Sequence, residues 1–222
     1  SPGSEFFYYV MELGDDPVHG QNIVPDEYRP RTLASDLAAG GAMTVHQTVQ
    51  TGLALSQALE LLHSKELIHR DIKPANFLVD KSGTVKVADL GLVRISDGTD
   101  SSGAADQESL TQAYTIAGTL EFMAPEQAVD TKTADHRADI YSLGIMAYEM
   151  LSGNPPYSRG DHMSVMYQHV QGKAQPLHEA NPSLPRDLVD VITKAMSVDK
   201  LKRYASMDEF RHALEDVVPN LE

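Results

Sequence analysis

The sequence predicts a mainly α-helical, α+β fold in which short β-hairpins interrupt a helical scaffold. Two long segments, 44–63 and 136–151, carry apolar residues at helical spacing and should form helices of the core. Between them, residues 77–79 and 85–87 are short β-prone runs on either side of a turn-forming sequence. A chain of 222 residues can bury a substantial core as one domain or one large lobe.

The N-terminal part of the chain begins with a predicted strand. Residues 7–13 (FYYVMEL) are an apolar run rich in aromatic and β-prone residues, which is typical of a buried strand. Residues 15–31 contain proline, glycine and acidic residues without periodicity and are expected to form a loop. A short helix should cover 33–39 and end at the two glycines that follow. Thr44 is expected to cap a long helix that continues to about His63.

The second half of the chain is predicted to be helical after a polar loop. Residues 96–109 are small, polar and acidic, a composition typical of a flexible loop. The helix at 136–151 is strongly apolar, so it should be central. Two further helices are expected at about 186–197 and 206–217, with Pro185 at the start of the first.

Composition and charge exclude several classes of site. Cysteine is absent, which excludes disulfides, thiolate metal sites and a cysteine nucleophile. The net charge of −14, from 18 basic and 32 acidic residues, would repel the phosphate backbone of nucleic acid. This charge is typical of a solvated surface, and a preference for basic peptide substrates is the alternative that stays open. No run of 18 apolar residues predicts a membrane span, and the first residues do not resemble a signal peptide.

The two ends of the chain are similar to remnants of cloning. Residues 1–6 (SPGSEF) resemble a tag remnant followed by translated cloning sites, and residues 221–222 (LE) resemble another. Both segments are therefore expected to lie outside the natural domain.

Three short motifs follow one another along the chain. Residues 69–76 read HRDIKPAN, residues 89–91 read DLG and residues 124–126 read APE. In order and spacing they resemble the catalytic loop, the metal-binding triplet and the end of the activation segment of the protein kinase family. The two predicted strands between the first two motifs agree with this resemblance, which extends from about residue 7 to residue 219.

Details of these motifs indicate a branch of the family. Lys73 in the catalytic loop is typical of serine/threonine kinases, whereas tyrosine kinases usually carry an arginine-containing variant there. Gln127, directly after the APE motif, and residues 134–144 (ADHRADIYSLG) look most like bacterial members. The sequence thus resembles the large, C-terminal lobe of a bacterial-type, eukaryote-like serine/threonine protein kinase.

The resemblance implies a set of catalytic residues. Phosphoryl transfer needs a positioned hydroxyl and cations on the phosphates. Asp71 would accept a hydrogen bond from the substrate hydroxyl and later its proton, and Lys73 would reach the transferring phosphate. Asn76 and Asp89 offer hard oxygen ligands to Mg²⁺. The alternative for Asp71, Asn76 and Asp89 is a purely structural role in a loop or helix cap.

The resemblance also implies an ATP site near residues 7–13. This segment looks like the last strand before the hinge between the two kinase lobes. Met11 then falls at the back of the nucleotide pocket, and the Glu12 carbonyl and Gly14 amide fall where an adenine ring is held. Leu78 would form the floor under that ring, so ATP and Mg²⁺ are the expected cofactors. A plain edge strand is the alternative for 7–13.

Four further residues match structural positions of the family. Glu126 and Arg203 match a buried ion pair that ties the activation segment to the late helices. Asp139 matches the helix residue that holds the backbone of the catalytic loop. His69 matches an apolar spine position, so it is expected to pack rather than to catalyse.

Regulation by phosphorylation is a further implication of the resemblance. Arg70 directly precedes the expected catalytic aspartate, where an arginine can clamp a phosphate on the activation loop. Thr111, Tyr114 and Thr115 lie in the window of such a phosphate, and an ordinary loop role is their alternative. Thr119 is instead expected to contact the catalytic aspartate and lysine.

The chain departs from the family pattern in one large respect. It contains no G-x-G-x-x-G loop to cover the phosphates, and nothing before residue 7 can supply the strand lysine and helix glutamate of a small lobe. We therefore expect residues 7–220 to be a large lobe without its small lobe, with the activation segment at 89–126. Leu90 in place of the usual phenylalanine is a smaller, tolerated change.

This organisation leads to the functional hypothesis and its alternatives. The expected activity is ATP-dependent phosphorylation of serine or threonine in protein substrates, in the cytoplasm, with this chain inactive alone. Its expected partners are the protein substrate, the missing small lobe and a second copy bound through the exposed interlobe face. A catalytically dead kinase-like binding module is the first alternative. A stand-alone fragment that assembles through its uncovered face is the second.

Overall fold

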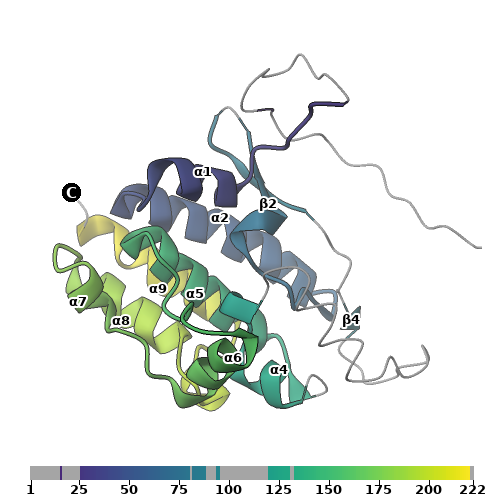
Figure 1. The fold of residues 1–222 in the computed structure, drawn as a ribbon, viewed down its shortest axis with the longest axis vertical. Coiled ribbons are helices and arrows are strands. Elements are labelled where there is room, and N and C mark those ends of the chain that lie inside the picture. The colour runs from purple at the N-terminus through teal and green to yellow at the C-terminus, as the bar shows by residue number, and fades with distance from the viewer. Residues whose placement is uncertain are drawn as a thin grey trace, which may run out of the picture.

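A computed structural model places residue 16 and residues 26–80, 82–88, 94–95, 120–130 and 133–220, and gives only the backbone at 94–95 and 220. Helices dominate this part of the chain (Figure 1), which confirms the predicted fold class. The α-helices are α1 Leu33–Gly40, α2 Val45–His63, α4 Pro125–Val129, α5 Arg137–Ser152, α6 His162–Gln171, α7 Leu177–Ala180, α8 Arg186–Ala195 and α9 Met207–Glu215. The strands are β1 Leu67–Ile68, β2 Phe77–Val79, β3 Val85–Val87 and β4 Arg94–Ile95. The 3-10 turns are η1 Pro74–Asn76, η2 Leu120–Phe122, η4 Lys200–Lys202 and η5 Val218–Asn220.

Helix α5 is the centre of the core, as its sequence predicts. Every residue from Ala138 to Tyr148 is buried, which is the pattern of a helix surrounded by protein on all sides. Helices α2, α7, α8 and α9 all contact it. A Cβ atom at Gly144 would lie 3.0 Å from the Cβ of Ala195, so glycine permits the close approach of α5 and α8.

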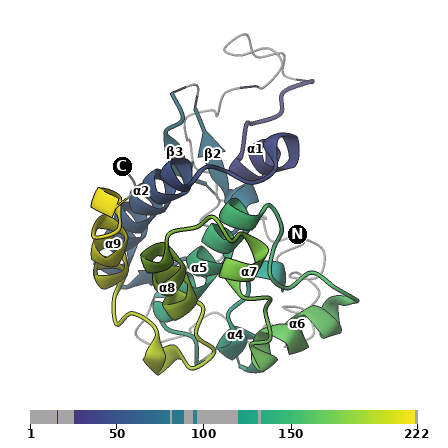
Figure 2. The ribbon, with the colours of Figure 1, turned by 90° about the vertical axis from the view of Figure 1, so that its left-hand side faces the viewer.

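Helices α2 and α9 lie side by side on one flank of α5 (Figure 2). The side chain of Thr44 accepts a hydrogen bond from the Gln47 amide and caps α2, as predicted. The apolar face of α2 buries Val49, Leu55 and Leu59. Because α2 ends at His63, its C-terminus delivers the chain directly to the segment that contains the HRD motif.

The predicted hairpin is confirmed as an antiparallel pair of β2 and β3, in which Phe77 pairs with Val87 and Val79 with Val85. Its turn is held by the Asp80 carboxylate, which accepts hydrogen bonds from the backbone of Ser82 and Thr84 at 2.8 and 2.9 Å. A second antiparallel pair, β1 with β4, was not predicted because each strand has only two residues.

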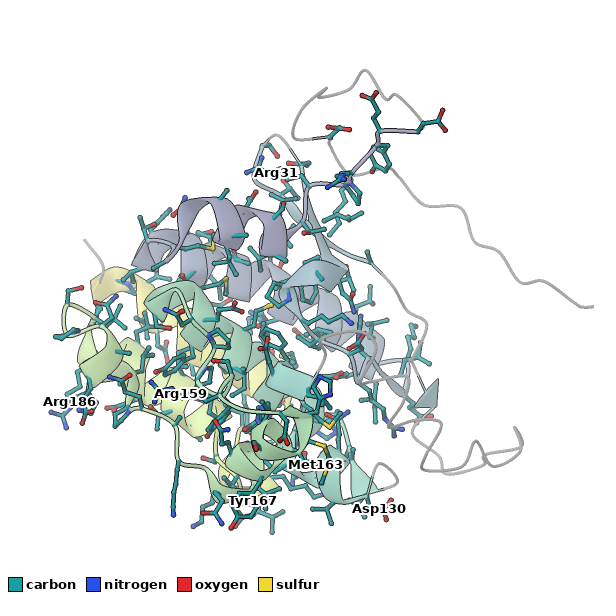
Figure 3. All side chains as sticks on the ribbon, viewed as in Figure 1. Arg31, Asp130, Arg159, Met163, Tyr167 and Arg186 are labelled. Carbon is teal, nitrogen blue, oxygen red and sulfur yellow. The ribbon has the colours of Figure 1, made fainter. Side chains whose placement is uncertain are left out.

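The predicted boundaries of the other helices differ little from those observed. Helix α1 ends one residue later than expected, and α8 and α9 each end two residues earlier. The sequence did not predict α4, α6 and α7. Helix α6 buries Val165 and His169 but exposes Met163 and Tyr167 (Figure 3), so its apolar residues do not form one face.

Two predicted segments, the strand 7–13 and the loop 96–109, lie outside the described residues. Among the helices that the structure does describe, none combines the length and the apolar character needed to cross a membrane.

Candidate active site

The carboxylate of Asp71 is the centre of the candidate site. Its Oδ2 atom lies 3.0 Å from the Nζ atom of Lys73 and accepts a hydrogen bond of 2.9 Å from the side-chain amide of Asn76. The same amide nitrogen donates to the Asp71 carbonyl at 2.8 Å. The structure therefore brings together three residues that the sequence assigned to one site, and all three are buried.

The second oxygen of this carboxylate has a different environment. Asp71 Oδ1 is buried and has no hydrogen-bond partner among the described residues. A buried carboxylate oxygen usually accepts a hydrogen bond, because leaving it unpaired costs roughly 1–3 kcal/mol or more. An acceptor held in this way is suited to receive a hydroxyl or amine hydrogen from a bound molecule.

Asp139 holds the backbone that carries Asp71. Its fully buried carboxylate accepts hydrogen bonds from the amides of His69 and Arg70, at 2.9 and 2.8 Å. Asp139 lies in the first turn of α5, the best-buried helix, so the segment with the HRD motif is fastened to the core of the domain. The expected contact of Asp139 with the loop is thus present.

His63 is a member of this network that the sequence analysis missed. Its Nε2 atom lies 2.8 Å from Oδ2 of Asp139, and its ring meets that of His136 edge-on with centroids 5.6 Å apart. His63 is the last residue of α2 and Asp139 is near the start of α5. No spacing in the sequence indicated this pair, because its two members are 76 residues apart.

His69 and Arg70 shape the loop from within. The His69 side chain is fully buried, and its Nδ1 atom accepts a 3.4 Å hydrogen bond from the Asp71 amide, so the ring packs as expected. Arg70 has a φ of +64°, in the left-handed region that costs an L-residue roughly 1–2 kcal/mol. Its guanidinium donates to the Ala134 carbonyl at 3.2 Å. The expected phosphate-bearing residues, at 111, 114 and 115, and Thr119 lie outside the described residues.

The nucleotide and metal positions are only partly described. The side-chain amide nitrogen of Asn76 donates both of its hydrogens to Asp71. The Oδ1 atom of Asn76 is therefore the side-chain atom that can bind a hard cation. The Ala88 amide donates to the Asn76 carbonyl at 2.8 Å, so the chain just before Asp89 lies against Asn76. Asp89 itself, with Met11, Glu12 and Gly14, lies outside the described residues. Leu78, on β2, is half-buried.

Glu126 and Arg203 form the ion pair that the sequence predicts. Two parallel hydrogen bonds of 2.7 and 2.8 Å join the guanidinium to the carboxylate. The remaining guanidinium N–H groups donate to the backbone carbonyls of Arg137, Ser197 and Val198. The pair fastens the APE segment to the residues between α8 and α9.

Two glutamates, Glu121 and Glu149, have raised pKa values. Burial and the nearby charge of Glu121 raise the pKa of Glu149 to about 7, and burial also raises the pKa of Glu121. Glu149 lies on α5 and Glu121 in η2, close to the APE motif. Neither residue stands out in the sequence, since the helical pattern gives no sign that a glutamate of α5 is desolvated.

A cavity of about 540 Å³ lies elsewhere, between α5, α7 and α8. Tyr148, Leu177 and Val189 are among the residues that line it. None of its lining residues belongs to the HRD segment, so this cavity is separate from the candidate site.

Comparison with known proteins agrees with the motifs and their geometry. The family model described as "Protein kinase domain" matches residues 15–215. A probable serine/threonine-protein kinase PknB of Bifidobacterium longum is 37% identical over 189 residues, which cover 85% of this chain and 26% of that protein. A probable serine/threonine-protein kinase of Clostridium perfringens is 34% identical over 195 residues, covering 88% of this chain and 27% of that protein.

A third relative gives the same result. The serine/threonine-protein kinase PknB of Mycobacterium leprae is 35% identical over 180 residues, which cover 81% of this chain and 28% of that protein. The chain thus spans less than a third of the length of these curated relatives. On its motifs, its geometry and these matches, the chain belongs to the protein kinase domain family, in the bacterial serine/threonine-kinase branch.

Proposed function

We propose that this chain is the large lobe of a kinase that transfers the γ-phosphoryl group of Mg-ATP to serine or threonine hydroxyls of proteins. The observation that carries the proposal is the Asp71 carboxylate, whose Oδ2 atom is held by Lys73 and Asn76 while Oδ1 has no partner among the described residues. This asymmetry leaves one oriented acceptor for a substrate hydroxyl.

Asp71 positions the nucleophile and takes its proton. The substrate hydroxyl donates to Oδ1, which orients its oxygen lone pair toward the phosphorus. As the new oxygen–phosphorus bond forms and the bond to the ADP oxygen breaks, the hydroxyl proton passes to Asp71. The bonds to Asn76 and Lys73 keep the carboxylate from rotating, because each occupies Oδ2.

Lys73 and Asn76 are assigned to neutralising the negative charge of the ATP phosphates. The Lys73 ammonium has three donors and contacts Asp71 at 3.0 Å, so it can bridge the carboxylate and a transferring phosphoryl oxygen. Asn76 Oδ1 and the Asp89 carboxylate are the hard oxygen donors that would hold Mg²⁺. Mg-ATP, when bound, supplies the phosphoryl group and the cation that neutralises its charge.

The rest of the nucleotide site follows the family pattern. We assign Met11, Glu12, Gly14 and Leu78 to the adenine side of the site, and residues 7–220 to the large lobe. The 222 residues contain no G-x-G-x-x-G sequence, so a small lobe must supply the phosphate cover. Since ATP is the phosphoryl donor, the cytoplasm is the proposed place of action.

The test compares Asp71→Asn with wild type in the natural full-length protein, with a radiolabelled ATP assay on a basic protein substrate. We expect kcat to fall at least about 100-fold, because asparagine keeps the shape but cannot accept the proton. The matched control is Asp190→Asn, an exposed aspartate on α8, which should retain wild-type kcat.

Two outcomes would reject the proposal. If Asp71→Asn retained most of the wild-type rate, Asp71 would not be the group that receives the hydroxyl proton. If the wild-type protein carried a Gly-rich loop and still transferred no phosphate, the chain would instead be a kinase-like binding module.

A further inference from the structure

Gln127 joins the APE segment to the catalytic loop. Its side chain is buried, with only 5% of its surface exposed. The amide oxygen accepts a 3.0 Å hydrogen bond from the backbone of Ala124, at the start of α4. The amide nitrogen donates a 3.2 Å hydrogen bond to the carbonyl of Arg70. One side chain therefore caps α4 and also reaches the residue before Asp71.

The Arg70 carbonyl belongs to the peptide group that leads into Asp71. The amide of this same peptide donates to Nδ1 of His69, at 3.4 Å, a long and weak bond. The bond from Gln127, at 3.2 Å, is therefore the shorter of these two hydrogen bonds on the peptide. The orientation of the peptide fixes where the Asp71 side chain leaves the backbone.

The backbone at this point needs such support. Arg70 has a φ of +64°, and an L-residue in this region is held there only by its surroundings. The Asp139 carboxylate holds the amide on the N-terminal side of Arg70 at 2.8 Å. The bond to Asp139 does not fix the next peptide group, between Arg70 and Asp71. That peptide group is the one that Gln127 binds.

We infer that Gln127 is a positioning residue for the phosphoryl-transfer reaction, acting through the Arg70–Asp71 peptide on the Asp71 carboxylate. It also couples the loop to α4, since Glu126 beside it is anchored by Arg203. A shift of α4 would therefore be transmitted to Asp71 through one hydrogen bond. This inference rests on the proposed kinase function for its kinetic consequence, but not for its structural one.

Two substitutions separate this role from helix capping. Gln127→Glu has the same shape and keeps the acceptor for the Ala124 amide, but it replaces the donor to Arg70 with a second acceptor. Gln127→Met keeps the volume and removes both hydrogen bonds. If the inference holds, both variants lose the loop contact, whereas only Gln127→Met loses the cap.

The matched control is Gln168→Glu. Gln168 lies on α6, and its amide nitrogen donates to the backbone carbonyl of Arg159 at 2.6 Å. Gln168→Glu makes the same chemical change and removes the hydrogen bond to the Arg159 carbonyl, which lies outside the catalytic loop. It tests whether any loss of such a bond lowers activity.

The kinetic arm uses the full-length kinase with a peptide substrate. We expect Gln127→Glu and Gln127→Met to lower kcat by about tenfold or more, the value of one lost hydrogen bond, with KM for ATP within about twofold of wild type. Gln168→Glu should keep the wild-type kcat. A wild-type kcat in Gln127→Glu, with or without a loss in Gln127→Met, would overturn the inference and leave the proposed function intact.

The second arm needs no activity and uses the 222-residue chain. Hydrogen exchange followed by NMR should show the amide of Asp71 exchanging about tenfold faster in Gln127→Glu than in wild type or Gln168→Glu. Unchanged exchange at this amide would overturn the inference. If wild-type kinase proved inactive, the proposed function would fail, and this arm would still decide whether Gln127 holds the loop.

Discussion

The Nε2 atom of His63 lies 2.8 Å from Oδ2 of Asp139, although the two residues are 76 positions apart in the sequence. His63 ends α2 and Asp139 lies in the first turn of α5, so the pair joins two core helices. The same carboxylate accepts hydrogen bonds from the backbone amides of His69 and Arg70. The segment with the HRD motif is therefore fixed to both helices through one carboxylate.

This relationship predicts that His63→Ala destabilises the domain. Asp139 is fully buried, and the loss of one of its donors should lower the free energy of unfolding by about 1–3 kcal/mol. Urea denaturation of the 222-residue chain measures this change. His212→Ala is the control, because that side chain is 58% exposed. A change in His63→Ala of less than about 0.5 kcal/mol, the range of neutral surface substitutions, would contradict the prediction.

The ion pair of Glu126 and Arg203 predicts a larger effect. The Arg203 side chain is fully buried and that of Glu126 is 12% exposed, so removing the carboxylate leaves a buried cation without its partner. Glu126→Ala should lower the free energy of unfolding by about 3–5 kcal/mol.

A surface pair provides the control for Glu126→Ala. Arg31 and Asp36 also form two hydrogen bonds of 2.8 Å, but their side chains are 34% and 27% exposed. Asp36→Ala should cost only about 0–1 kcal/mol in the same urea denaturation. Equal losses in the two variants would show that burial does not govern the strength of the Glu126 pair.

The raised pKa of Glu149 predicts a pH dependence of stability. In the folded chain the pKa is about 7, against an ordinary value of 4.5, so the folded state binds the proton more tightly. The stability that this provides is fully present below about pH 4.5 and is lost as the pH rises through about 7. Glu149→Gln removes this loss, so its melting temperature should exceed that of wild type more at about pH 8 than at about pH 5.

His169 gives the stability of the fold the opposite dependence on pH, over a similar pH range. Burial lowers its pKa to about 4 from 6.5, so its contribution is present above about pH 6.5 and is lost as the pH falls through about 4. In wild type, the pH dependences of stability that come from Glu149 and His169 oppose each other. Glu149→Gln should therefore reveal the rise of stability with pH that comes from His169. Glu179→Gln, on the exposed side of α7, is the control. A difference between Glu149→Gln and wild type that is the same at both pH values would exclude a shifted Glu149.

The 222-residue chain alone should not transfer phosphate appreciably. It contains no Gly-rich loop to cover the phosphates, so only the adenine and metal contacts proposed above would hold ATP. We expect a Kd for Mg-ATP above about 100 µM by calorimetry. A kcat near about 1 per second in a radiolabel assay, or a low-micromolar Kd, would contradict this.

The chain should also associate with itself through the face that a small lobe would cover. An exposed strand edge pairs readily with another edge, and uncovered apolar surface favours a partner. The net charge of −14 opposes association, but salt at about 0.15 M screens it within about 8 Å. Light scattering over a tenfold range of concentration tests this. A constant mass of 24.3 kDa, that of one chain, would refute it.

The sequence by itself determined the helices whose signals are local. Thr44 caps α2 because its hydroxyl needs only the amide three residues ahead, and α5 is central because nearly every residue in it is apolar. It also indicated Asp71, Lys73 and Asn76 as one site, through the resemblance of residues 69–76 to the kinase catalytic loop. The resemblance, rather than periodicity, supplied the pair of Glu126 and Arg203.

The tertiary structure decided what depends on distant partners. The contacts of His63 with Asp139 and of Gln127 with Arg70 join residues 76 and 57 positions apart, and no local pattern encodes such a distance. Helix α6 escaped prediction because it exposes apolar side chains that a single-face pattern would bury. The shifted pKa of Glu149 has the same origin, since desolvation is a property of the packed fold and not of the residue type.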